Sequence, residues 1–333
     1  MWYDSEKANN VKYLFFFALI SVLGIVGIVG PTASFAQRYP DHPIQLVIPN
    51  PPGANMDVMA RMLAEEMEKL LGAKIIPINK PGAATVLGTD AVVRAKKDGY
   101  TLVYTGASAL LYTLISNPGV VHYDPPRDLE PLGFHFIFPT TITVRADSPW
   151  KTFPELIEYA KKNPGKLRVS TTGVASSPHF MVEMIQSMTG AQFTHVPFEG
   201  GESVTTALLG GHVEVTCDGF AKVKPHVDAG KLRILLITNT LPAFPGIPTI
   251  TELGYKQSIP AAWFGLYGPA GIPEDVKRVL VPAVEKAVKA TKPRIDALGS
   301  LCEYKSPAEV RKLWDEEYKE IYGIAVKIGV RKS

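Results

Sequence analysis

Short β-branched segments alternate with amphipathic helical segments along most of this chain, and that alternation restricts its fold more than any other feature. Residues 44–48 (IQLVI) form a strand-like run, Pro-Pro-Gly follows, and from Asp57 apolar residues recur at helical spacing as far as Leu71. Further strand-like runs cover 74–78, where an internal proline indicates a sheet edge, and 101–104. A succession of strand, loop and helix predicts a parallel sheet with helices on both faces.

The alternation stops at 118–132, where prolines and aspartates predict an irregular connection, and then resumes. An extended segment is predicted at 140–144, a second alternating series has strands at 167–170, 193–196, 213–217 and 232–238, and a further strand is predicted at 263–267. Amphipathic helices at 273–290 and 307–326 complete the chain. Because 333 residues are enough for two domains, the two series predict two α/β lobes of similar build.

The N-terminus has the features of an export signal. Lys7 and Lys12 precede an uncharged stretch at 13–30, and small residues lead to a cleavage site after Ala36. The stretch is also long enough to serve as an uncleaved membrane anchor. Cleavage is the favoured interpretation because the small residues stand where a signal peptidase needs them. In either case the chain from Gln37 onward is expected on the non-cytoplasmic side.

Composition and motifs argue against several classes of protein. The formal charge of +3 comes without a basic stripe, so no nucleic-acid partner is expected. Cys217 and Cys302 stand far apart in the sequence, and two free thiols are favoured over a disulfide. Neither cysteine belongs to a CxxC motif or a Cys/His cluster, so no metal site is expected, and no cofactor is expected either. Nucleotide-binding, hydrolase and metalloprotease motifs are missing. A Ser176/His179 nucleophile pair would lack an orienting third group, so we expect no enzyme.

Three loops rich in small residues follow predicted strands at 53–57, 82–85 and 173–177. Ligands of open α/β sheets bind beyond the carboxyl ends of the strands, where free N–H groups of helix N-termini attract anions. Each loop alone is explained as a turn or helix cap. Asp57 and His179 likewise suit caps or packing as well as ligand contacts. Three such loops at matching positions of two lobes favour a shared anion-binding cleft.

In these loops and beyond, the chain resembles the solute-binding receptors of tripartite tricarboxylate transporters, also called the Bug family. The similarity runs from about Tyr39 to the C-terminus. Its most specific fragments are Pro51-Pro52-Gly53 with Asp57, Asn79-Lys80-Pro81-Gly82-Ala83, Asp98-Gly99-Tyr100, Tyr123-Asp124-Pro125, Asn163-Pro164-Gly165, Ser176-Ser177 with His179, His195-Val196-Pro197-Phe198, Leu209-Gly210-Gly211, Ala229-Gly230-Lys231-Leu232-Arg233 and Trp263-Phe264-Gly265. Their order and spacing together carry the resemblance.

The resemblance implies a periplasmic-binding-protein-like α/β fold, with two doubly wound lobes joined by two crossover hinge segments. Lobe 1 would contain 37–139 and 261–333, lobe 2 would contain 140–260, and 1–36 would be the signal peptide. The implied protein is a periplasmic, monomeric receptor that closes on a small organic carboxylate and delivers it to membrane permease subunits. The expected ligand-binding residues are Asn50, Gly53, Ala54, Asn55, Asp57, Ala84, Thr85, Ser108, Thr172, Val174, Ala175, Ser176, Ser177, His179 and Phe198.

Departures from the family pattern bear on the ligand. Met56, Val86 and Val174 stand where the family more often has small or polar residues, which suggests a carboxylate with an apolar or aromatic body. Two other functions stay open at this point. The receptor could feed a membrane signalling kinase, or Ser176 or Ser177 could serve a hydrolase. It also stays open whether residues 13–30 are kept and tether the receptor to the membrane.

Overall fold

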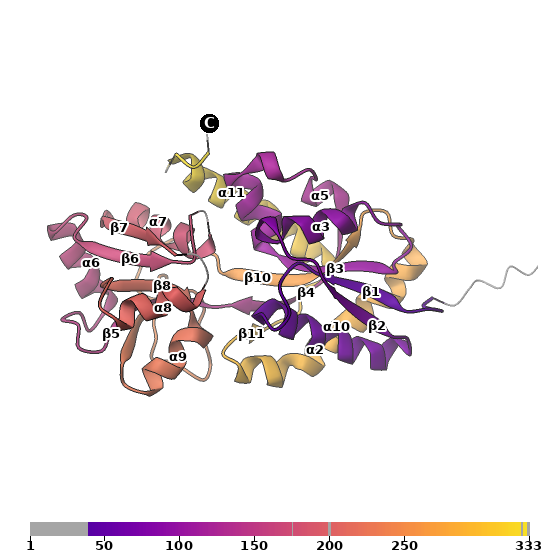
Figure 1. Cartoon of the computed structure of the whole chain (residues 1–333), viewed down its shortest axis with the longest axis horizontal. Coiled ribbons are helices and arrows are strands. Elements are labelled where there is room, and N and C mark those ends of the chain that lie inside the picture. Colours follow the sequence, from indigo (N-terminus) through magenta and orange to yellow (C-terminus); the bar gives the residue numbers. More distant parts are fainter. Residues whose placement is uncertain (1–38, 175, 199–200, 328, 332–333) are drawn as a thin grey trace, which may run out of the picture. The chain divides into compact units, whose positions relative to one another are not determined.

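Two β-sheets organise this computed structural model, which describes residues 39–174, 176–198, 201–327 and 329–331 (Figure 1). The six-stranded sheet has the order β11 (Leu301–Cys302), β4 (Leu129–Phe138), β10 (Ala262–Pro269), β3 (Thr101–Gly106), β1 (Ile44–Ile48), β2 (Ile75–Asn79). The five-stranded sheet has the order β7 (Phe193–Pro197), β6 (Leu167–Thr171), β8 (Val215–Gly219), β5 (Thr140–Arg145), β9 (Leu232–Ile237).

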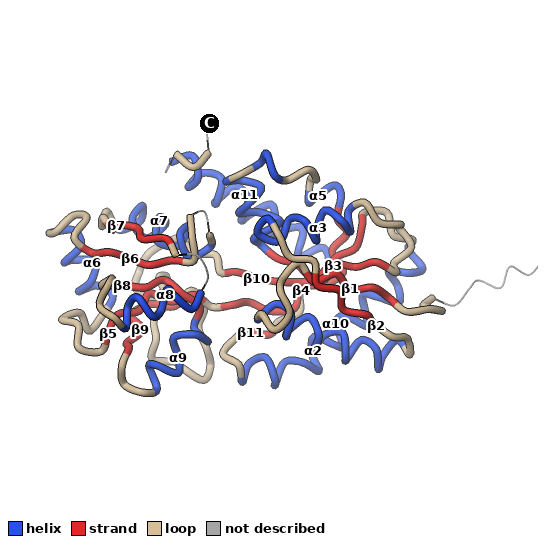
Figure 2. Tube along the Cα trace, viewed as in Figure 1, coloured by secondary structure: helices blue, strands red, loops and turns tan. Residues whose placement is uncertain are grey.

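Helices connect most of the strands and cover the sheets (Figure 2). The longer ones are α2 (Asn55–Leu71), α3 (Val86–Val93), α6 (Phe153–Lys162), α7 (Ser177–Thr189), α8 (Gly201–Leu209), α9 (Phe220–Asp228), α10 (Glu274–Ala297) and α11 (Pro307–Lys327). Short turns of helix are η1 (Ala83–Thr85), η2 (Ser108–Tyr112, of π type), α4 (Thr113–Ser116), η3 (Pro118–Val120) and α5 (Pro125–Asp128).

The predicted strands are present, but their directions are mixed. Pairs β1–β2, β1–β3, β6–β7 and β6–β8 are parallel, and β2 lies at the sheet edge as its proline indicated. Strands β10, β4, β11 and β5 pair antiparallel, so the sheets are mixed where the alternation predicted a parallel sheet, and β4 and β11 were not predicted as strands. Apolar periodicity identifies a buried strand but carries no information on its direction. The irregular connection expected at 118–132 is also partly wrong, because β4 begins at Leu129.

The chain passes between the two sheets twice. Strand β4 ends at Phe138, Pro139 follows, and β5 begins at Thr140 in the other sheet. The return path runs through 238–261 from β9 to β10. Both crossings therefore adjoin long strands of the six-stranded sheet, β4 and β10, which pair with each other along their whole length.

Helices pack on both faces of the six-stranded sheet. Helices α2 and α10 contact each other on one face, and α3 and α11 lie on the other (Figure 1). A buried polar link joins strands and helix: Tyr104 Oη lies 2.6 Å from His135 Nδ1, and Thr291 Oγ1 lies 2.9 Å from His135 Nε2. Burial lowers the pKa of His135 to about 3, so the ring is neutral and ties β3, β4 and α10 together without a buried charge.

The five-stranded sheet has one strongly apolar face and one mixed face. Helices α6 and α7 form a large apolar cluster with β5, β6, β8 and β9. Helices α8 and α9 pack on the other face through a smaller apolar cluster. On this face buried polar side chains bond to one another, as where Thr205 Oγ1 donates to Asp218 Oδ2 at 3.1 Å. A buried carboxyl group therefore lies beneath α8 at the end of β8.

Both cysteines, Cys217 and Cys302, are buried free thiols, which is the interpretation that the sequence favoured. Burial raises the pKa of both thiols, which leaves them protonated and unreactive.

None of the helices within the described ranges combines the length and apolar character that a membrane crossing needs. The predicted export signal at 1–36 and the candidate anchor at 13–30 lie outside the described residues.

Helix α11 packs against β10 through a buried carboxyl group. Trp263 Nε1 donates to Glu317 Oε2 at 2.7 Å. Burial raises the pKa of Glu317 to about 8, with a smaller contribution in the same direction from Glu320. The folded protein thus keeps a proton on Glu317 in a pH range where the unfolded chain has already released it.

We expect Glu317→Gln to change the pH dependence of stability. In the native protein the free energy of unfolding falls as the pH rises from about 4.5 to about 8, because the folded state binds the extra proton. Glutamine keeps an acceptor for Trp263 and cannot ionise, so the variant gains stability relative to the native protein over this range. Chemical denaturation at several pH values measures this, with the exposed Glu316→Gln as control. Parallel pH profiles of native protein and variant would contradict the expectation.

Candidate functional site

The loop between β1 and α2 presents the uncapped end of a long helix. Gly53 has φ 81°, a conformation that favours glycine, and Ala54 takes an extended conformation as the N-cap of α2. No side chain in the described ranges caps this helix. The backbone N–H groups of Asn55 and Met56 bond to no acceptor among the described residues. Such free amides at the positive end of a helix dipole bind anions.

A buried carboxylate fixes the geometry of this loop. Asp57 is 3% exposed, and its Oδ2 accepts the Gly53 N–H at 2.8 Å. Its oxygens also accept from Arg61 Nε at 2.9 and 3.0 Å and from Asn79 Nδ2 at 2.8 Å. The second N–H of the Asn79 amide reaches the carbonyl oxygen of Asn50 at 2.8 Å. Asp57 thus connects the loop to α2 and β2.

Hydrogen bonds keep Asp57 ionised despite its burial. Burial alone would raise the pKa of this carboxyl group, but the bonds from Arg61, the Gly53 amide and Asn79 together lower it. The Gly53 N–H is occupied by Asp57 and is not free for a ligand in this structure. A direct contact of Asp57 with ligand therefore stays a prediction, while its contacts show the structural role of a loop anchor.

A cavity of about 690 Å³ opens beside this loop and has walls from both sheets. We call it the central cavity. The residues that line it are Asn50, Gly53, Ala54, Asn55, Met56, Phe136, Phe138, Thr172, Ala221, Lys222 and Phe264. Five of them, Asn50, Gly53, Ala54, Asn55 and Thr172, belong to the ligand-binding set expected from the sequence. The structure thus brings the first loop together with the end of β6, on the other sheet.

The sequence did not indicate the aromatic residues or the lysine of this cavity. Phe136 and Phe138 lie in β4, whose start was taken for an irregular connection, and Phe264 lies opposite Phe136 in β10. Lys222 stands in the first turn of α9, directly after β8. Its position after a strand end, where α/β proteins bind ligands, is a signal that could have identified it.

Lys222 is the only charged residue among the described residues that line the central cavity. Its Nζ lies 3.7 Å from Asp218 Oδ1. Burial raises the pKa of Asp218, although Lys222, the Gly219 amide and Thr205 act in the opposite direction. The lysine side chain is about one third exposed, whereas Asp218 is buried. The charge that the cavity offers a ligand is therefore positive.

The second predicted loop, 83–85, has an unusual backbone. Ala83, Ala84 and Thr85 have φ values of 46°, 50° and 77°, in the left-handed region that non-glycine residues rarely occupy. Ser108 Oγ donates to the Ala84 carbonyl oxygen at 3.3 Å, and Thr85 Oγ1 is buried with no partner among the described residues. The structure thus brings Ala84, Thr85 and Ser108 together, but not among the residues that line the central cavity.

In the third loop the serines cap and connect helices. Ser176 Oγ accepts the His179 N–H at 3.3 Å and donates to the Gly173 carbonyl at 2.7 Å, which is the geometry of a helix cap and not of a nucleophile held by a base. Ser177 Oγ donates to Tyr112 Oη at 3.3 Å, and Tyr112 lies in η2, which follows β3 of the six-stranded sheet. Val174 is 65% exposed. Ala175, which belongs to the predicted set, lies outside the described residues.

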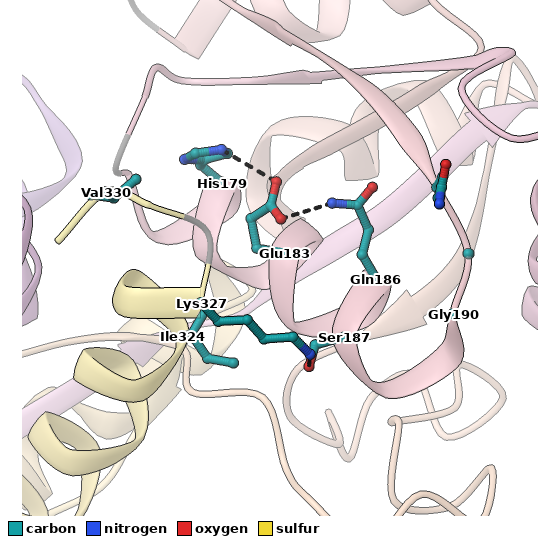
Figure 3. A pocket seen from close by; sticks show the side chains of 10 residues that line it. His179, Glu183, Gln186, Ser187, Gly190, Ile324, Lys327 and Val330 are labelled. Atoms are coloured by element: carbon teal, nitrogen blue, oxygen red, sulfur yellow. Dashed lines mark hydrogen bonds and ion pairs between the residues drawn. The ribbon is translucent and has the colours of Figure 1, made fainter. Parts of the chain in front are cut away.

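His179 lines a second cavity, of about 580 Å³, between α7 and the end of α11 (Figure 3). Its ring stacks on His195 at 4.1 Å, and its Nε2 lies 3.6 Å from Glu183 Oε1. Burial, reinforced by His179, lowers the pKa of His195 to about 4. Lys327 Nζ donates to Ser187 Oγ at 2.6 Å and links α11 to α7. The structure does not bring His179 to the central cavity.

Phe198, the last residue of the predicted set, packs against the five-stranded sheet's smaller apolar cluster and lies away from the central cavity. Phe198 is partly buried against the apolar cluster of α8 and α9, and its N–H donates to the Thr171 carbonyl at 2.9 Å. It is not among the residues that line the central cavity. Within the described ranges, no three His, Cys, Asp or Glu side chains come together as metal ligands would. The central cavity, with its amide donors and Lys222, can bind an anion.

We expect Asp57→Ala to lower the free energy of unfolding by about 1–3 kcal/mol, because three donors lose a buried acceptor. Urea denaturation measures the change. Asp90→Ala is the matched control, since Asp90 also pairs with an arginine four residues on, Arg94, but at the surface. Its cost should stay below about 1 kcal/mol. Equal losses in the two variants would show that Asp57 does not anchor the loop.

We expect Ala84→Gly to stabilise the protein or leave its stability unchanged. The left-handed backbone at Ala84 costs about 1–2 kcal/mol, more than the roughly 0.5–1 kcal/mol of backbone entropy that glycine adds to the unfolded chain. Ala290→Gly, at an exposed position inside α10, is the control and should lose about 1 kcal/mol. A loss of the same size in both variants, measured by urea denaturation, would refute strain at this loop.

Comparisons with known proteins agree with this architecture. Residues 59–301 match the model of the tripartite tricarboxylate transporter family receptor. The chain is 30% identical over 321 residues to protein BugT of Bordetella pertussis, with 94% of this chain and 98% of BugT covered. The match thus extends over almost the full length of both proteins.

Comparison with solved structures also identifies a periplasmic binding protein. The structure of periplasmic binding protein BugD has a TM-score of 0.70 at 30% identity, with 89% of this chain and all of that chain covered. MatC from Rhodopseudomonas palustris, with bound malate, has a TM-score of 0.70 at 27% identity, with 86% and 99% covered. The fold is that of a periplasmic binding protein, and this chain belongs to the Bug family of tripartite tricarboxylate transporter receptors.

Proposed function

We propose that this protein is an extracytoplasmic receptor that captures a small organic carboxylate in the central cavity and delivers it to membrane permease subunits. The observation that carries the proposal is the lining of that cavity: free amides of α2, amide side chains of Asn50 and Asn55, and Lys222, with no acidic residue among the described residues that line it. These groups donate hydrogen bonds and attract negative charge.

The relatives support a carboxylate as the ligand. MatC, whose fold matches that of this chain, was solved with bound malate. The hydrogen-bond donors and the cation around the central cavity here suit a carboxylate group. The Ser176 geometry gives no support to a hydrolase, since its hydroxyl is engaged by two backbone groups.

We propose one lobe of 37–139 with 261–333 and a second lobe of 140–260; this division is supported by the sheets, since the strands of each sheet fall within one of these ranges. Closure would be a hinge motion at Pro139 and in 238–261, where the chain crosses between the sheets. Ligand contacts on both lobes shift the population toward the closed form. Closure would carry the described lobe 2 residues of the predicted set, Val174, Ser176, Ser177, His179 and Phe198, toward the ligand, whereas Ala84, Thr85 and Ser108 lie in the same lobe as α2 and would not move relative to it.

Export and assembly follow from the same proposal. Residues 1–36 would direct the chain across the membrane, by cleavage after Ala36 or with 13–30 kept as a tether, so the receptor acts in the periplasm. It would act as a monomer that presents its closed form to the permease. No nucleic acid, cofactor or metal takes part in this scheme.

A ligand screen combined with one backbone substitution tests the proposal. We expect small organic acids to raise the melting temperature of the purified protein; a ligand at a hundred times its Kd adds about 2.7 kcal/mol of stability. Matched neutral amides, amines and sugars should have no effect. Stabilisation by amines or sugars with no response to any organic acid would contradict the proposal.

Asn55→Pro then tests the amide donors directly. Proline removes the N–H but fits the first position of a helix, and the preceding Ala54 is already extended. We expect about ten- to hundredfold weaker binding of the acid, the effect of one lost hydrogen bond to a charged group. Asn55→Ala separates the contribution of the side chain. Glu274→Pro, at the first position of α10 and outside the cavity, is the control and should bind normally.

A further inference from the structure

An aromatic surface forms one wall of the central cavity. Phe136 and Phe264 face each other across the β4–β10 pair, and their rings stack with centroids 4.8 Å apart and planes 15° apart. Phe136 is fully buried, whereas Phe138 and Phe264 are partly exposed. Phe136 thus covers one face of the Phe264 ring, and Phe138, Phe264 and Met56 give the cavity an apolar side that a purely polar ligand would leave unused.

The aromatic wall lies directly against the helix that carries the lysine. A Cβ atom on Gly219, the N-cap of α9, would lie 1.9 Å from Cε1 and 2.4 Å from Cζ of Phe138. The Phe138 ring therefore rests on the backbone of Gly219, three residues before Lys222. This close approach brings an aromatic ring against the start of the helix that carries Lys222, and both residues line the same cavity.

The charges of the cavity suit a single negative group. Lys222 is the only Lys, Arg or His among the described residues of its lining, and the buried Asp218 lies 3.7 Å from its Nζ. A second or third carboxylate on the same ligand would have no further Lys, Arg or His opposite it among the described residues that line the cavity. Asn50, Asn55 and Thr172 can bond to neutral polar groups but cannot neutralise charge.

We propose that, given a carboxylate receptor, the ligand of this cavity is an aromatic monocarboxylate. Its carboxylate contacts Lys222 Nζ and the free amides of the first turn of α2, and its ring lies on Phe138 and Phe264. This inference rests on the proposed function and narrows it to a ligand class. Lys222 is the residue that selects for charge, and the two phenylalanines select for the ring.

The test compares ligands that differ in one feature. Titration calorimetry on the purified full chain, freed of co-purified ligand by exchange without denaturation, measures Kd for benzoate, benzamide, acetate, malate and citrate. Benzoate should bind at least about tenfold tighter than malate, citrate and acetate. Benzamide has the same ring without the charge and should not bind measurably.

Variants then assign the two selecting groups. Lys222→Gln should weaken benzoate binding about ten- to hundredfold, while Lys222→Arg keeps most of it. Lys224→Gln is the matched control, because Lys224 lies on the same helix, pairs with Asp228 and is not part of the cavity lining. Phe264→Leu should weaken benzoate binding while leaving acetate binding unchanged. Thermal melting of each variant verifies that it is folded.

The outcomes separate the ligand class from the receptor function. Malate or citrate binding tighter than benzoate, with equal affinities in Lys222→Gln and Lys224→Gln, would overturn the aromatic monocarboxylate and leave the carboxylate receptor intact. Failure of every organic acid to bind would overturn both. Tight benzoate binding that is lost in Lys222→Gln and kept in Lys224→Gln supports the proposed class.

Discussion

The bond from the Gly53 amide to the buried carboxylate of Asp57 holds the loop on which the cavity depends. It links the turn after β1 to the first turn of α2, and through Asn79 it also secures the carbonyl of Asn50. With the loop held by a carboxylate outside the cavity, the amides of Asn55 and Met56 stay without partners in the described structure. The carboxylate therefore supports an anion site without entering it, since a negative charge in the lining would repel the ligand.

The opposite wall depends on two strands that also connect the sheets. β4 and β10 pair antiparallel, place Phe136 and Phe264 ring to ring, and then lead into the two crossings between the sheets. His135, buried and neutral, fixes β4 to β3 and α10 from within the core. The apolar part of the cavity thus lies on rigid strands, whereas its polar part comes from loops and helix ends. A closing motion would bring the loops toward a fixed surface.

The sequence was sufficient to predict most strands, the long helices and the first loop of the site, but not β4 or β11. Local signals determine the predicted features: β-branched runs, helical periodicity up to Leu71, and the small residues Gly53 and Ala54 after a strand. Strand direction was not predictable, because the apolar pattern of β4 and β10 is the same for either direction. Phe138 was missed because only tertiary packing on Gly219 brings it to the cavity. Lys222 was missed although its position directly after a strand end is a local signal for a site residue. His179 follows the local pattern of a site residue, yet its helix turns it toward the cavity beside α11.

A crystal structure of the protein with a bound organic acid would show which groups hold the ligand. We expect its carboxylate oxygens within hydrogen-bond distance of the Asn55 and Met56 amides, between the loop that Asp57 holds and the first turn of α9. A ligand seated in the cavity of His179 and Lys327, with the α2 amides still without partners, would contradict this expectation.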